Sequence, residues 1–375
     1  MQATAKPRDS IAFSVSVLTH PGGAERMVSV MANYWATRGK SISVVSLDDP
    51  SEPVFYYFDP STRFSRLHAS SKSSSLVQAV ARNLRRVRRL RAALRRADPD
   101  IVISVLTEMN VLTLLASVGL GIPVIVAEQT VAGVAPIRRV WDRLRIWTYR
   151  LAFRIVLPYE SAVHHFSPAL RERIRVIPNP VQKQPVLATP SAARAAFRLI
   201  AVGRLAPEKN FDLLIRAFQR IALRRPDWTL TIYGEGPERH RLEGLRAELQ
   251  LSDRISLPGS VTNVPEKLAD ADLLVFSSLF EAFPMALCEA MAAGLPVVAT
   301  RCPGGIVDIV REGIDGLLVP PGDPVALAEA LDSLMADALL RARFGARAVE
   351  VTERFALEKV MDRWDAIMMD PKPDK

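Results

Sequence analysis

The sequence predicts an α/β fold of two domains, each a doubly wound parallel sheet with helices on both faces. The chain has 375 residues, whereas a typical domain has about 150. Short apolar, β-branched runs alternate with helical stretches along most of the chain, as expected for parallel strands buried on both faces. A connector rich in Pro, Ala and Ser interrupts this alternation at residues 181–193. We therefore expect the linker between the domains there.

The first half opens with a βαβ unit. Residues 11–18 (IAFSVSVL) form an apolar run, a loop with Gly22 and Gly23 follows, and Gly39 stops the helical stretch after it. Residues 41–47 (SISVVSL) are the next strand. Beyond it we expect a helix at 109–118 and strands at 101–105, 123–127, 154–157 and 175–177.

The second half repeats the pattern. We expect strands at 198–203, 228–234, 254–259, 272–278, 296–300 and 316–320, and helices at 210–224, 237–250, 264–269, 284–293 and 305–311, with more helices from about 323. The predicted domains are 1–185 and 186–350. A C-terminal helix and tail at 351–375 can pack back on the first domain.

The excess of positive charge lies in the first half. The net charge is +9, and residues 1–190 carry 26 Lys and Arg against 13 Asp and Glu, whereas residues 191–375 carry 23 against 27. A nucleic acid, an anionic membrane surface or a phosphorylated substrate would each suit such a half. No nucleic-acid-binding signature accompanies the charge, so we expect no nucleic acid partner.

Two cysteines, Cys288 and Cys302, exclude a disulfide framework and favour a reducing cytosolic compartment. No apolar segment typical of a secretion signal follows Met1. The most apolar run, 111–127, is interrupted by Gly and Pro and is shorter than the ~20 residues that a membrane-spanning helix needs. We therefore expect a cytoplasmic protein without a transmembrane segment.

The first candidate site is GRLAPEK, Gly203 to Lys209, between a predicted strand and a predicted helix. Ligands of open α/β sheets bind at the carboxyl ends of the strands. Gly203 permits a turn there, and Arg204 and Lys209 offer a planar fork and a point charge to phosphate. The alternative is that both cations are solvated surface charges.

The second candidate site is a pair of glutamates, Glu281 and Glu289, separated by seven residues. Glu281 falls in the loop before the predicted helix at 284–293, and Glu289 falls about one and a half turns inside it. A glutamate buried among apolar strands needs a partner such as a ligand hydroxyl. Alternatively, Glu289 forms hydrogen bonds with backbone groups, and Glu281 interacts favourably with the helix dipole.

The third candidate site is the pair of glycines Gly22 and Gly23. They permit close approach of the backbone to a ligand, or they form an ordinary turn.

Together these stretches resemble retaining glycosyltransferase family 4, which has the GT-B architecture of two Rossmann-like domains facing across an interdomain cleft. HPGGAERMVSVMANYWATRGKSISVVSL resembles its N-terminal loop and first βαβ unit, and RVIPNPV resembles the motif that closes its first domain. Three further stretches resemble successive signatures of the family's C-terminal domain, namely VGRLAPEKNFDLLIRAF, IYGEGPER and LFEAFPMALCEAMAAGLPVVATRCPGGIVDIVREGIDGLLVP. The last is the most specific.

The resemblance implies sugar transfer from a nucleotide-sugar, most often a UDP-sugar, with retention of anomeric configuration and without a metal ion or other cofactor. The domain at 1–185 would bind the acceptor, and the domain at 186–350 would bind the donor. Arg204 and Lys209 would bind the donor diphosphate, Glu281 the transferred sugar and Glu289 the ribose. Catalysis would be electrostatic, because the leaving diphosphate develops negative charge. Further implied donor contacts are Gly23, Gly203, Gly234, Ser260, Val261, Phe283, Pro284 and Met285.

Two positions depart from the family pattern. Ala282 stands where relatives usually have Gly, and Gln129 stands where many have a His. Gln129, its neighbour Glu128, and His20 beside the glycine loop are therefore candidate contacts to the acceptor or the sugar. Which of Gln129 and Glu128 replaces the usual His stays open.

Two stretches combine arginines with an apolar stripe of helical period. Residues 81–97 carry eight arginines around Leu84, Val87, Leu90 and Leu94. Residues 137–153 place on one helical face Ile137, Val140, Trp141, Leu144, Trp147 and Leu151. Such helices suit an anionic lipid surface. The alternative is that both stripes pack on the sheet and only the arginines face solvent.

We therefore predict a glycosyltransferase, peripheral on the cytoplasmic face of the membrane, that acts on a lipid-linked saccharide or a surface-polysaccharide acceptor. The alternatives are a soluble glycosyltransferase with a small acceptor, and a catalytically idle GT-B protein that serves as a binding or scaffold module. The donor sugar, the acceptor, the linkage and the oligomeric state stay open.

Overall fold

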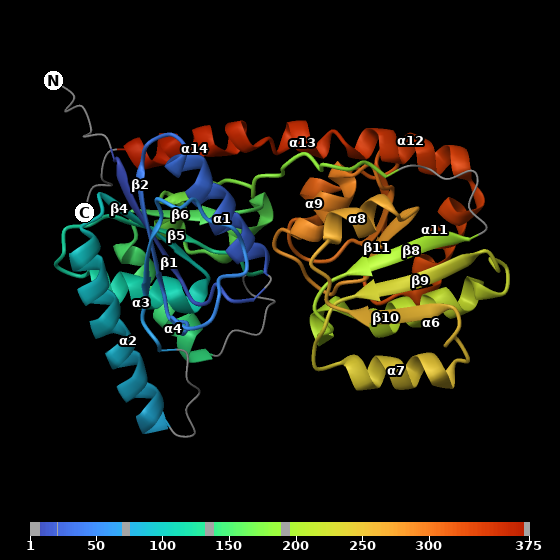
Figure 1. Ribbon diagram of the computed structural model, residues 1–375, viewed down its shortest axis with the longest axis horizontal. Helices are drawn as coiled ribbons and strands as arrows, with labels where there is room; N and C mark the ends of the chain where they lie inside the picture. Colours follow the sequence, from blue (N-terminus) through green and yellow to red (C-terminus); the bar gives the residue numbers. More distant parts are fainter. Residues whose placement is uncertain (1–7, 21, 70–75, 132–138, 189–195, 371–375) are drawn as a thin grey trace. The chain divides into compact units, whose positions relative to one another are not determined.

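The computed structural model describes residues 8–20, 22–69, 76–131, 139–188 and 196–370. It forms two compact units, Met1–Pro180 with Glu358–Lys375, and Val181–Leu357 (Figure 1). Three parts of the predicted segments lie outside the described residues, namely 189–193 of the linker, 137–138 of the second basic stretch and 371–375 of the tail.

Within the described residues, the first unit contains a seven-stranded parallel sheet in the order β3-β2-β1-β4-β5-β6-β7. The strands are β1 (Ser10–Val15), β2 (Ser41–Ser46), β3 (Arg63–Arg66), β4 (Ile101–Val105), β5 (Val124–Ala127), β6 (Arg154–Leu157) and β7 (Ile174–Val176). The order reverses between β1 and β4, so the crossover helices fall on opposite faces. The doubly wound prediction is thus confirmed. The edge strand β3 (RFSR) was not predicted because it has no apolar run.

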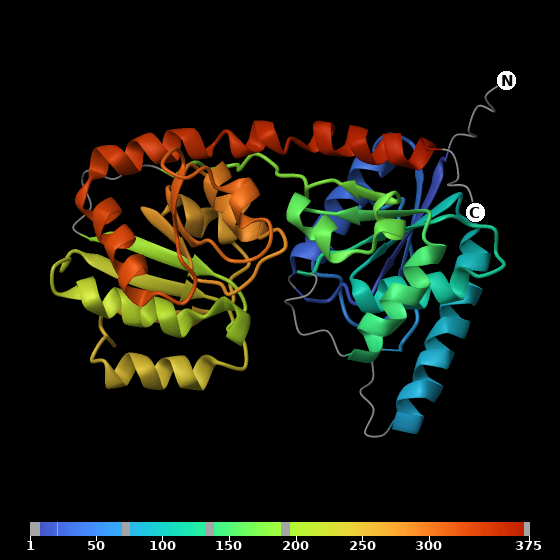
Figure 2. The ribbon, with the colours of Figure 1, turned by 180° about the vertical axis from the view of Figure 1, so that it is seen from behind.

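The helices of the first unit are α1 (Gly23–Ala36), α2 (Leu76–Ala97), α3 (Thr107–Ser117), α4 (Arg139–Thr148), η1 (Tyr149–Leu151), η2 (Glu160–His165), α5 (Pro168–Arg171) and α14 (Leu357–Met369). Helix α3 packs between α2 and α4 (Figures 1 and 2). The end of the chain is fastened to this unit, because Trp35 Nε1 of α1 donates to Asp365 Oδ1 at 2.8 Å. Arg154 Nε donates to Asp370 Oδ2, also at 2.8 Å.

The second unit contains, within its described residues, a six-stranded parallel sheet in the order β10-β9-β8-β11-β12-β13. The strands are β8 (Phe197–Val202), β9 (Trp228–Tyr233), β10 (Ile255–Gly259), β11 (Leu273–Phe276), β12 (Val297–Thr300) and β13 (Gly316–Val319). The helices are η3 (Pro207–Lys209), α6 (Phe211–Ala222), α7 (Arg239–Glu248), α8 (Val264–Ala269), α9 (Met285–Ala292), α10 (Ile306–Ile309), α11 (Pro324–Ala336), α12 (Ala338–Ala348) and α13 (Val351–Arg354). Apolar clusters bury both faces of the sheet.

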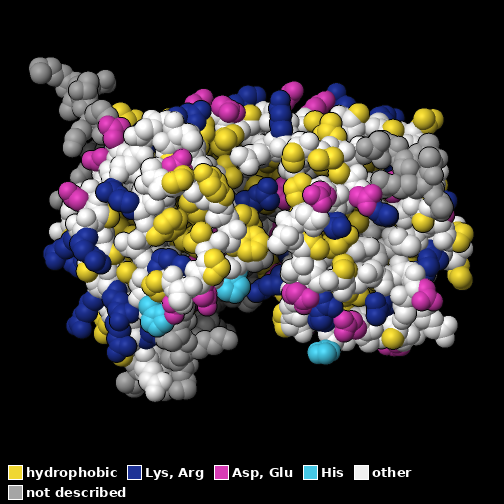
Figure 3. All heavy atoms as spheres, viewed as in Figure 1, with side chains coloured by type: hydrophobic (Ala, Val, Ile, Leu, Met, Phe, Trp, Pro, Cys, Tyr) yellow, Lys and Arg dark blue, Asp and Glu magenta, His cyan; other side chains and the backbone are white. Residues whose placement is uncertain are grey.

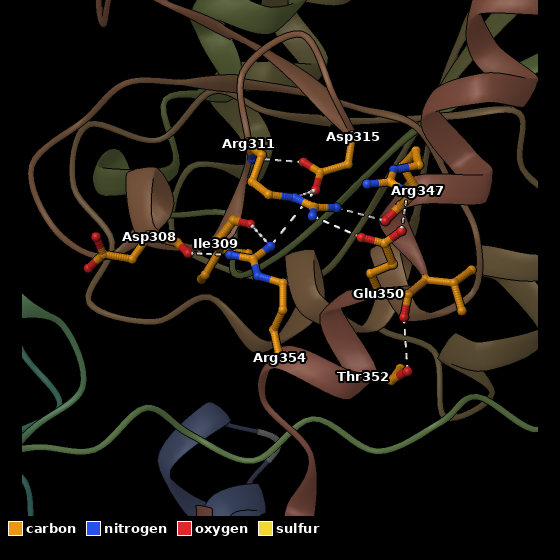
Figure 4. A network of polar contacts seen from close by, with 9 residues as sticks. Asp308, Ile309, Arg311, Asp315, Arg347, Glu350, Thr352 and Arg354 are labelled. Atoms are coloured by element: carbon orange, nitrogen blue, oxygen red, sulfur yellow. Dashed lines mark hydrogen bonds and ion pairs between the residues drawn. The ribbon is translucent and has the colours of Figure 1, made fainter. Parts of the chain in front are cut away.

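A network of ion pairs fastens the last helices of this unit to the loop before β13 (Figure 4). Asp315 is fully buried and accepts hydrogen bonds from Arg311 N at 2.7 Å and Arg311 Nε at 2.6 Å. Arg311 Nη1 also donates to Glu350 Oε2 at 2.9 Å, and Arg354 Nη1 donates to the carbonyl of Ile309 at 2.7 Å. The network thus joins Glu350 and Arg354, at the end of this unit, to the segment between α10 and β13.

Candidate active site

Most of the predicted donor residues lie at the point where the strand order of the second sheet reverses. The segment Gly203–Lys209 follows β8, and Glu281 follows β11, the strand next to β8. In open α/β sheets the helices leave such a point on opposite faces, so a crevice forms outside the carboxyl ends of the strands. The fold therefore gathers the two candidate sites at one place.

Lys209 and Glu281 form an ion pair across this point. Lys209 Nζ lies 2.5 Å from Glu281 Oε1, and the two side chains are 19% and 11% exposed. Ser278 Oγ donates to the same carboxylate oxygen at 2.6 Å. Ser277 Oγ donates to the carbonyl of Lys209 at 2.8 Å. Two neighbouring serines at the end of β11 thus hold both charged residues.

Glycines allow three neighbouring strand ends to approach each other. Gly234 has φ +146°, and a Cβ there would collide with the carbonyl oxygen of Gly203. The amide of Gly234 donates to the carbonyl of Gly259 at 2.9 Å, and the partly exposed turn of Ser260 and Val261 comes next. The backbones at the ends of β8 and β9 are therefore in direct contact, and the side chains of Glu235 and Arg239 lie beside Gly259.

Arg204 is the other predicted cation. It is 69% exposed, and its Nη2 lies 2.9 Å from Glu208 Oε1. Burial acts to raise the pKa of Glu208. The hydrogen bond from Arg204, the residue's own backbone amide, and the charges of Arg204 and Lys209 outweigh burial and lower that pKa. The ionised form of Glu208 is thus favoured by both cations, Arg204 and Lys209.

The loop before α9 and the first turns of that helix carry the other predicted donor contacts. Phe283, Pro284 and Met285 are buried, and the ring of Phe283 packs edge-on against Phe355 at 5.4 Å. Pro284 precedes the first helical residue, and the amide groups of a first helical turn have no partner within their own helix. Glu289, in the second turn, is 6% exposed.

Two predicted residues of the first unit, His20 and Gly23, follow β1, one of the two strands between which the strand order reverses, whereas Glu128 and Gln129 follow β5. His20 and Gly23 are exposed on the loop after β1, and His20 Nδ1 lies 2.9 Å from Thr19 Oγ1. Gly23 begins α1.

Glu128 does not fit the expected role as a contact to acceptor or sugar. It is 0% exposed, and both carboxylate oxygens accept hydrogen bonds from buried or half-buried hydroxyl groups. Thr107 and Thr130 donate to Oε1 at 2.7 and 2.6 Å, and Tyr149 donates to Oε2 at 2.7 Å. Burial and the neighbouring carboxylate raise the pKa of Tyr149 well above its ordinary value. Glu128 therefore joins the loop after β5 to α3 and η1.

Gln129 is held by Asn179, a residue of the RVIPNPV segment. Gln129 Nε2 donates to Asn179 Oδ1, and Asn179 Nδ2 donates to Gln129 Oε1, both at 3.0 Å. Gln129 Nε2 also lies 3.3 Å from Met27 Sδ. The reciprocal pair fixes the orientation of the half-buried amide that stands at the position of the usual His.

Comparison with known proteins decides the family. Residues 192–351 match the family model "Glycosyl transferases group 1", and residues 21–184 match "Glycosyltransferase Family 4". The two ranges follow each other and cover most of the chain. The chain belongs to glycosyltransferase family 4. This confirms the predicted family and the GT-B fold.

Two relatives illustrate the range of similarity to this family 4 glycosyltransferase. An exopolysaccharide phosphotransferase of Streptomyces coelicolor is 38% identical over 52% of the chain, and the chain spans only 20% of that relative's length. An α-1,4-N-acetyl-D-galactosaminyltransferase of Campylobacter jejuni, whose name gives a PP-undecaprenol-linked acceptor, is 23% identical over 96% of the chain and 99% of its own length. Among solved structures, Anabaena HepE in complex with UDP has a TM-score of 0.76 at 20% identity, covering 95% of this chain and 98% of that one.

Sequence reasoning missed three residues that contact the candidate residues of the two units. Ser278 and Glu208 touch the predicted site residues Glu281 and Arg204, and Asn179 touches Gln129. Ser278 had a usable signal, because a hydroxyl residue directly after a buried strand lies at the ligand-binding edge of a parallel sheet. The pairing of Asn179 with Gln129 spans 50 residues and had no local signal.

The apolar stripe predicted for the second basic stretch is divided between two faces of α4, because Trp141 packs inward and the rest of the described stripe does not. In α4, Trp141, Arg145 and Thr148 are buried, whereas an apolar stripe of Val140, Leu144 and Trp147 faces solvent, with Trp147 76% exposed. Arg145 is buried because it pairs with Asp142 at 2.7 Å and stands over the ring of Phe166. In α2, by contrast, Leu90 and Leu94 pack inward and Leu84 is exposed. The alternative that both apolar stripes pack on the sheet is therefore wrong for α4.

In the described ranges of the chain, none of the helices is both long and apolar enough to cross a bilayer. In the same ranges, His, Cys, Asp and Glu form no group of three or more that is arranged to hold a metal ion.

Proposed function

We propose that this family 4 glycosyltransferase transfers a sugar from a UDP-sugar to a lipid-linked saccharide or a surface-polysaccharide acceptor, with retention of the anomeric configuration. The observation that carries the proposal is the Lys209–Glu281 pair at the strand-order reversal, beside Arg204 and the first turn of α9. Because the cation and the carboxylate lie at hydrogen-bond distance, the cation can bind the diphosphate of a donor while the carboxylate binds the sugar of the same donor.

Each charged residue then has one role. Lys209 and Arg204 bind the diphosphate and offset the negative charge that develops as it leaves. Glu281 accepts hydrogen bonds from hydroxyls of the transferred sugar, and Glu289 accepts them from the ribose. The nucleotide base lies near Gly234 and the segment 259–261, at the ends of β9 and β10. Because two cations supply the positive charge, the proposed mechanism needs no metal ion.

The choice of UDP and of the acceptor is supported by similar proteins. HepE, which shares the fold, was solved with UDP, and the relative from Campylobacter jejuni is named for a PP-undecaprenol-linked acceptor. A polyprenyl diphosphate lies in a bilayer, so an enzyme that uses it has to work at the membrane surface.

We propose that α4 supplies membrane contact on the cytoplasmic face. Its solvent-facing stripe of Val140, Leu144 and Trp147 continues to Leu151 in η1, which is also exposed. Basic side chains gather along the edge of the first unit where α2 lies (Figures 1 and 3). A helix that exposes Trp and Leu beside arginines suits an anionic lipid surface, where apolar burial and charge attraction add.

Nucleotide binding tests the donor part. UDP, ADP and GDP are each added at about 100 times a micromolar dissociation constant, where a ligand stabilises the folded state by about 2.7 kcal/mol. We expect UDP to raise the melting temperature most, with or without EDTA. A panel of UDP-sugars then identifies the hydrolysed donor, and NMR of the product gives its anomeric configuration. If none of the nucleotides stabilises the protein, the idle GT-B alternative replaces the proposal.

Vesicle cosedimentation tests the membrane part. We expect binding to vesicles with 30 mol% phosphatidylglycerol, release by about 0.5 M salt, and a several-fold loss in Trp147→Ala. Leu223→Ala is the matched control, because it removes an exposed apolar side chain from the other unit. Equal loss in both variants, or equal binding to neutral vesicles, would refute α4 as the contact.

A further inference from the structure

Ser278 has no role in the proposed mechanism of sugar transfer. It stands two residues after the last residue of β11 and is 1% exposed. Its Oγ donates to Glu281 Oε1 at 2.6 Å. Its own carbonyl accepts a hydrogen bond from Thr300 Oγ1, also at 2.6 Å. The backbone of Ser278 is therefore held from the next strand, independently of what its hydroxyl does.

The two oxygens of Glu281 are in different situations. Oε1 receives both Lys209 Nζ and Ser278 Oγ. Across the described part of the chain, neither a hydrogen bond nor an ion pair reaches Oε2. A carboxylate with one oxygen fixed twice keeps a defined plane, so the other oxygen is aimed in one direction and retains its capacity to accept hydrogen bonds.

Binding of a donor would change only one of these two contacts. Lys209 also serves the diphosphate in the proposed mechanism, so a bound donor draws its ammonium group partly away from Glu281. The hydroxyl of Ser278 is buried and has no such second task. It is the contact that holds the carboxylate in place once the diphosphate is bound.

We propose that Ser278 is a positioning residue, which fixes Oε1 of Glu281 so that Oε2 accepts hydrogen bonds from hydroxyls of the transferred sugar. The inference rests on the proposed function, because it takes the ligand of Glu281 to be that sugar. It differs from a structural role in one measurable respect: loss of the hydroxyl affects the sugar part of the donor and not the nucleotide part.

The experiment compares wild type with Ser278→Ala, Ser278→Thr and Ser277→Ala. Ser278→Ala removes the hydroxyl, and Ser278→Thr retains it. Ser277→Ala is the matched control, because it removes an equally buried hydroxyl one residue away that donates to the carbonyl of Lys209 rather than to Glu281. Calorimetry measures the affinity for UDP and for UDP-glucose, UDP-galactose and UDP-N-acetylglucosamine, and donor hydrolysis gives kcat and KM.

A hydrogen bond to an ionised group is strong enough that its loss changes an equilibrium by about tenfold or more. For Ser278→Ala we expect about a tenfold loss in kcat and in affinity for the best UDP-sugar, with UDP affinity within twofold of wild type. Ser278→Thr should recover most of the loss, and Ser277→Ala should keep the wild-type ratio of UDP-sugar to UDP affinity. Ser278→Cys keeps the volume with a weaker donor and replaces Ser278→Ala if that variant does not fold.

Two results have distinct meanings. An unchanged ratio of UDP-sugar to UDP affinity, together with unchanged kcat, in a folded Ser278→Ala or Ser278→Cys variant overturns the positioning role. Absence of binding of all four nucleotides to the wild-type protein instead overturns the proposed function on which the role rests.

Discussion

Replacing Lys209 by methionine separates catalysis from folding at this site. The substitution keeps most of the length of the side chain and removes its charge. Lys209 Nζ lies 2.5 Å from Glu281 Oε1 and 5.8 Å from the centroid of the Phe276 ring, and the Lys209 side chain is 19% exposed. Methionine retains the apolar stem, so the lost interactions are those of the charge.

The cost to folding is the smaller of the two effects. Breaking a fully buried ion pair costs about 3–5 kcal/mol. Here both side chains keep some exposure, and Ser278 still donates to the carboxylate. We therefore expect a loss of about 1–2 kcal/mol, or about 2–8 °C in melting temperature for a unit of this size. Removal of a group that meets developing charge lowers kcat about 10²- to 10³-fold, which is about 2.7–4 kcal/mol.

The assay measures kcat for donor hydrolysis and the melting temperature of the same preparation. Lys183→Met is the control, because it makes the same change at an exposed position of the second unit. The variant at position 209 should lose at least a hundredfold in kcat while it stays folded at 25 °C. If its kcat lies within threefold of wild type, Lys209 does not act on the leaving diphosphate and the mechanism is wrong.

Four further outcomes can be checked. Glu289→Gln should weaken UDP binding about tenfold with little change in kcat, and unchanged affinity by calorimetry contradicts its ribose role. Burial, with the nearby carboxylate of Glu281, raises the pKa of Cys302 to about 11; its thiol is then protonated at pH 8, and iodoacetamide should label it only after denaturation. Asp315→Ala breaks the buried pair with Arg311 and should destabilise by about 3 kcal/mol, or about 6–12 °C, whereas a shift below 2 °C excludes a stabilising network. Leu106 has φ +74° and ψ +144°, a region that glycine tolerates far better, so Leu106→Gly should melt about 2–4 °C above Leu106→Ala, and the reverse order excludes backbone strain there.

The candidate site shows where local sequence is sufficient. Gly203 directly follows the apolar run of β8, Lys209 stands in the loop beyond it, and Glu281 stands in the loop beyond β11. The carboxyl ends of parallel strands lie along one edge of a sheet. That rule alone gathers them, whatever the details of packing. The path of the loop is also needed to identify Ser278 as the partner of Glu281. The sequence of residues 277–281 does not show which serine hydroxyl, that of Ser277 or that of Ser278, points toward Glu281.

The first unit shows where local sequence is insufficient. Glu128 and Gln129 are adjacent polar residues at the end of one strand, yet the first is fully buried and the second is half-buried. The difference comes from Tyr149 and Asn179, which are 21 and 50 residues away along the chain. A single residue gives no sign of such distant partners.

The sequence by itself determined the alternation of strands and helices, the two sheets, the family and the positions of the charged motifs. Each of these depends on the spacing of residues within a short segment. Only the tertiary structure decided that α4 turns Trp141 and Arg145 inward and Trp147 outward, and that Trp35 is the residue of α1 that holds α14 through Asp365. The physical reason is that helical period defines a stripe but not its direction. The direction is set by which distant groups, here Phe166 beside Arg145 and Trp35 beside Asp365, offer contacts that the solvent cannot.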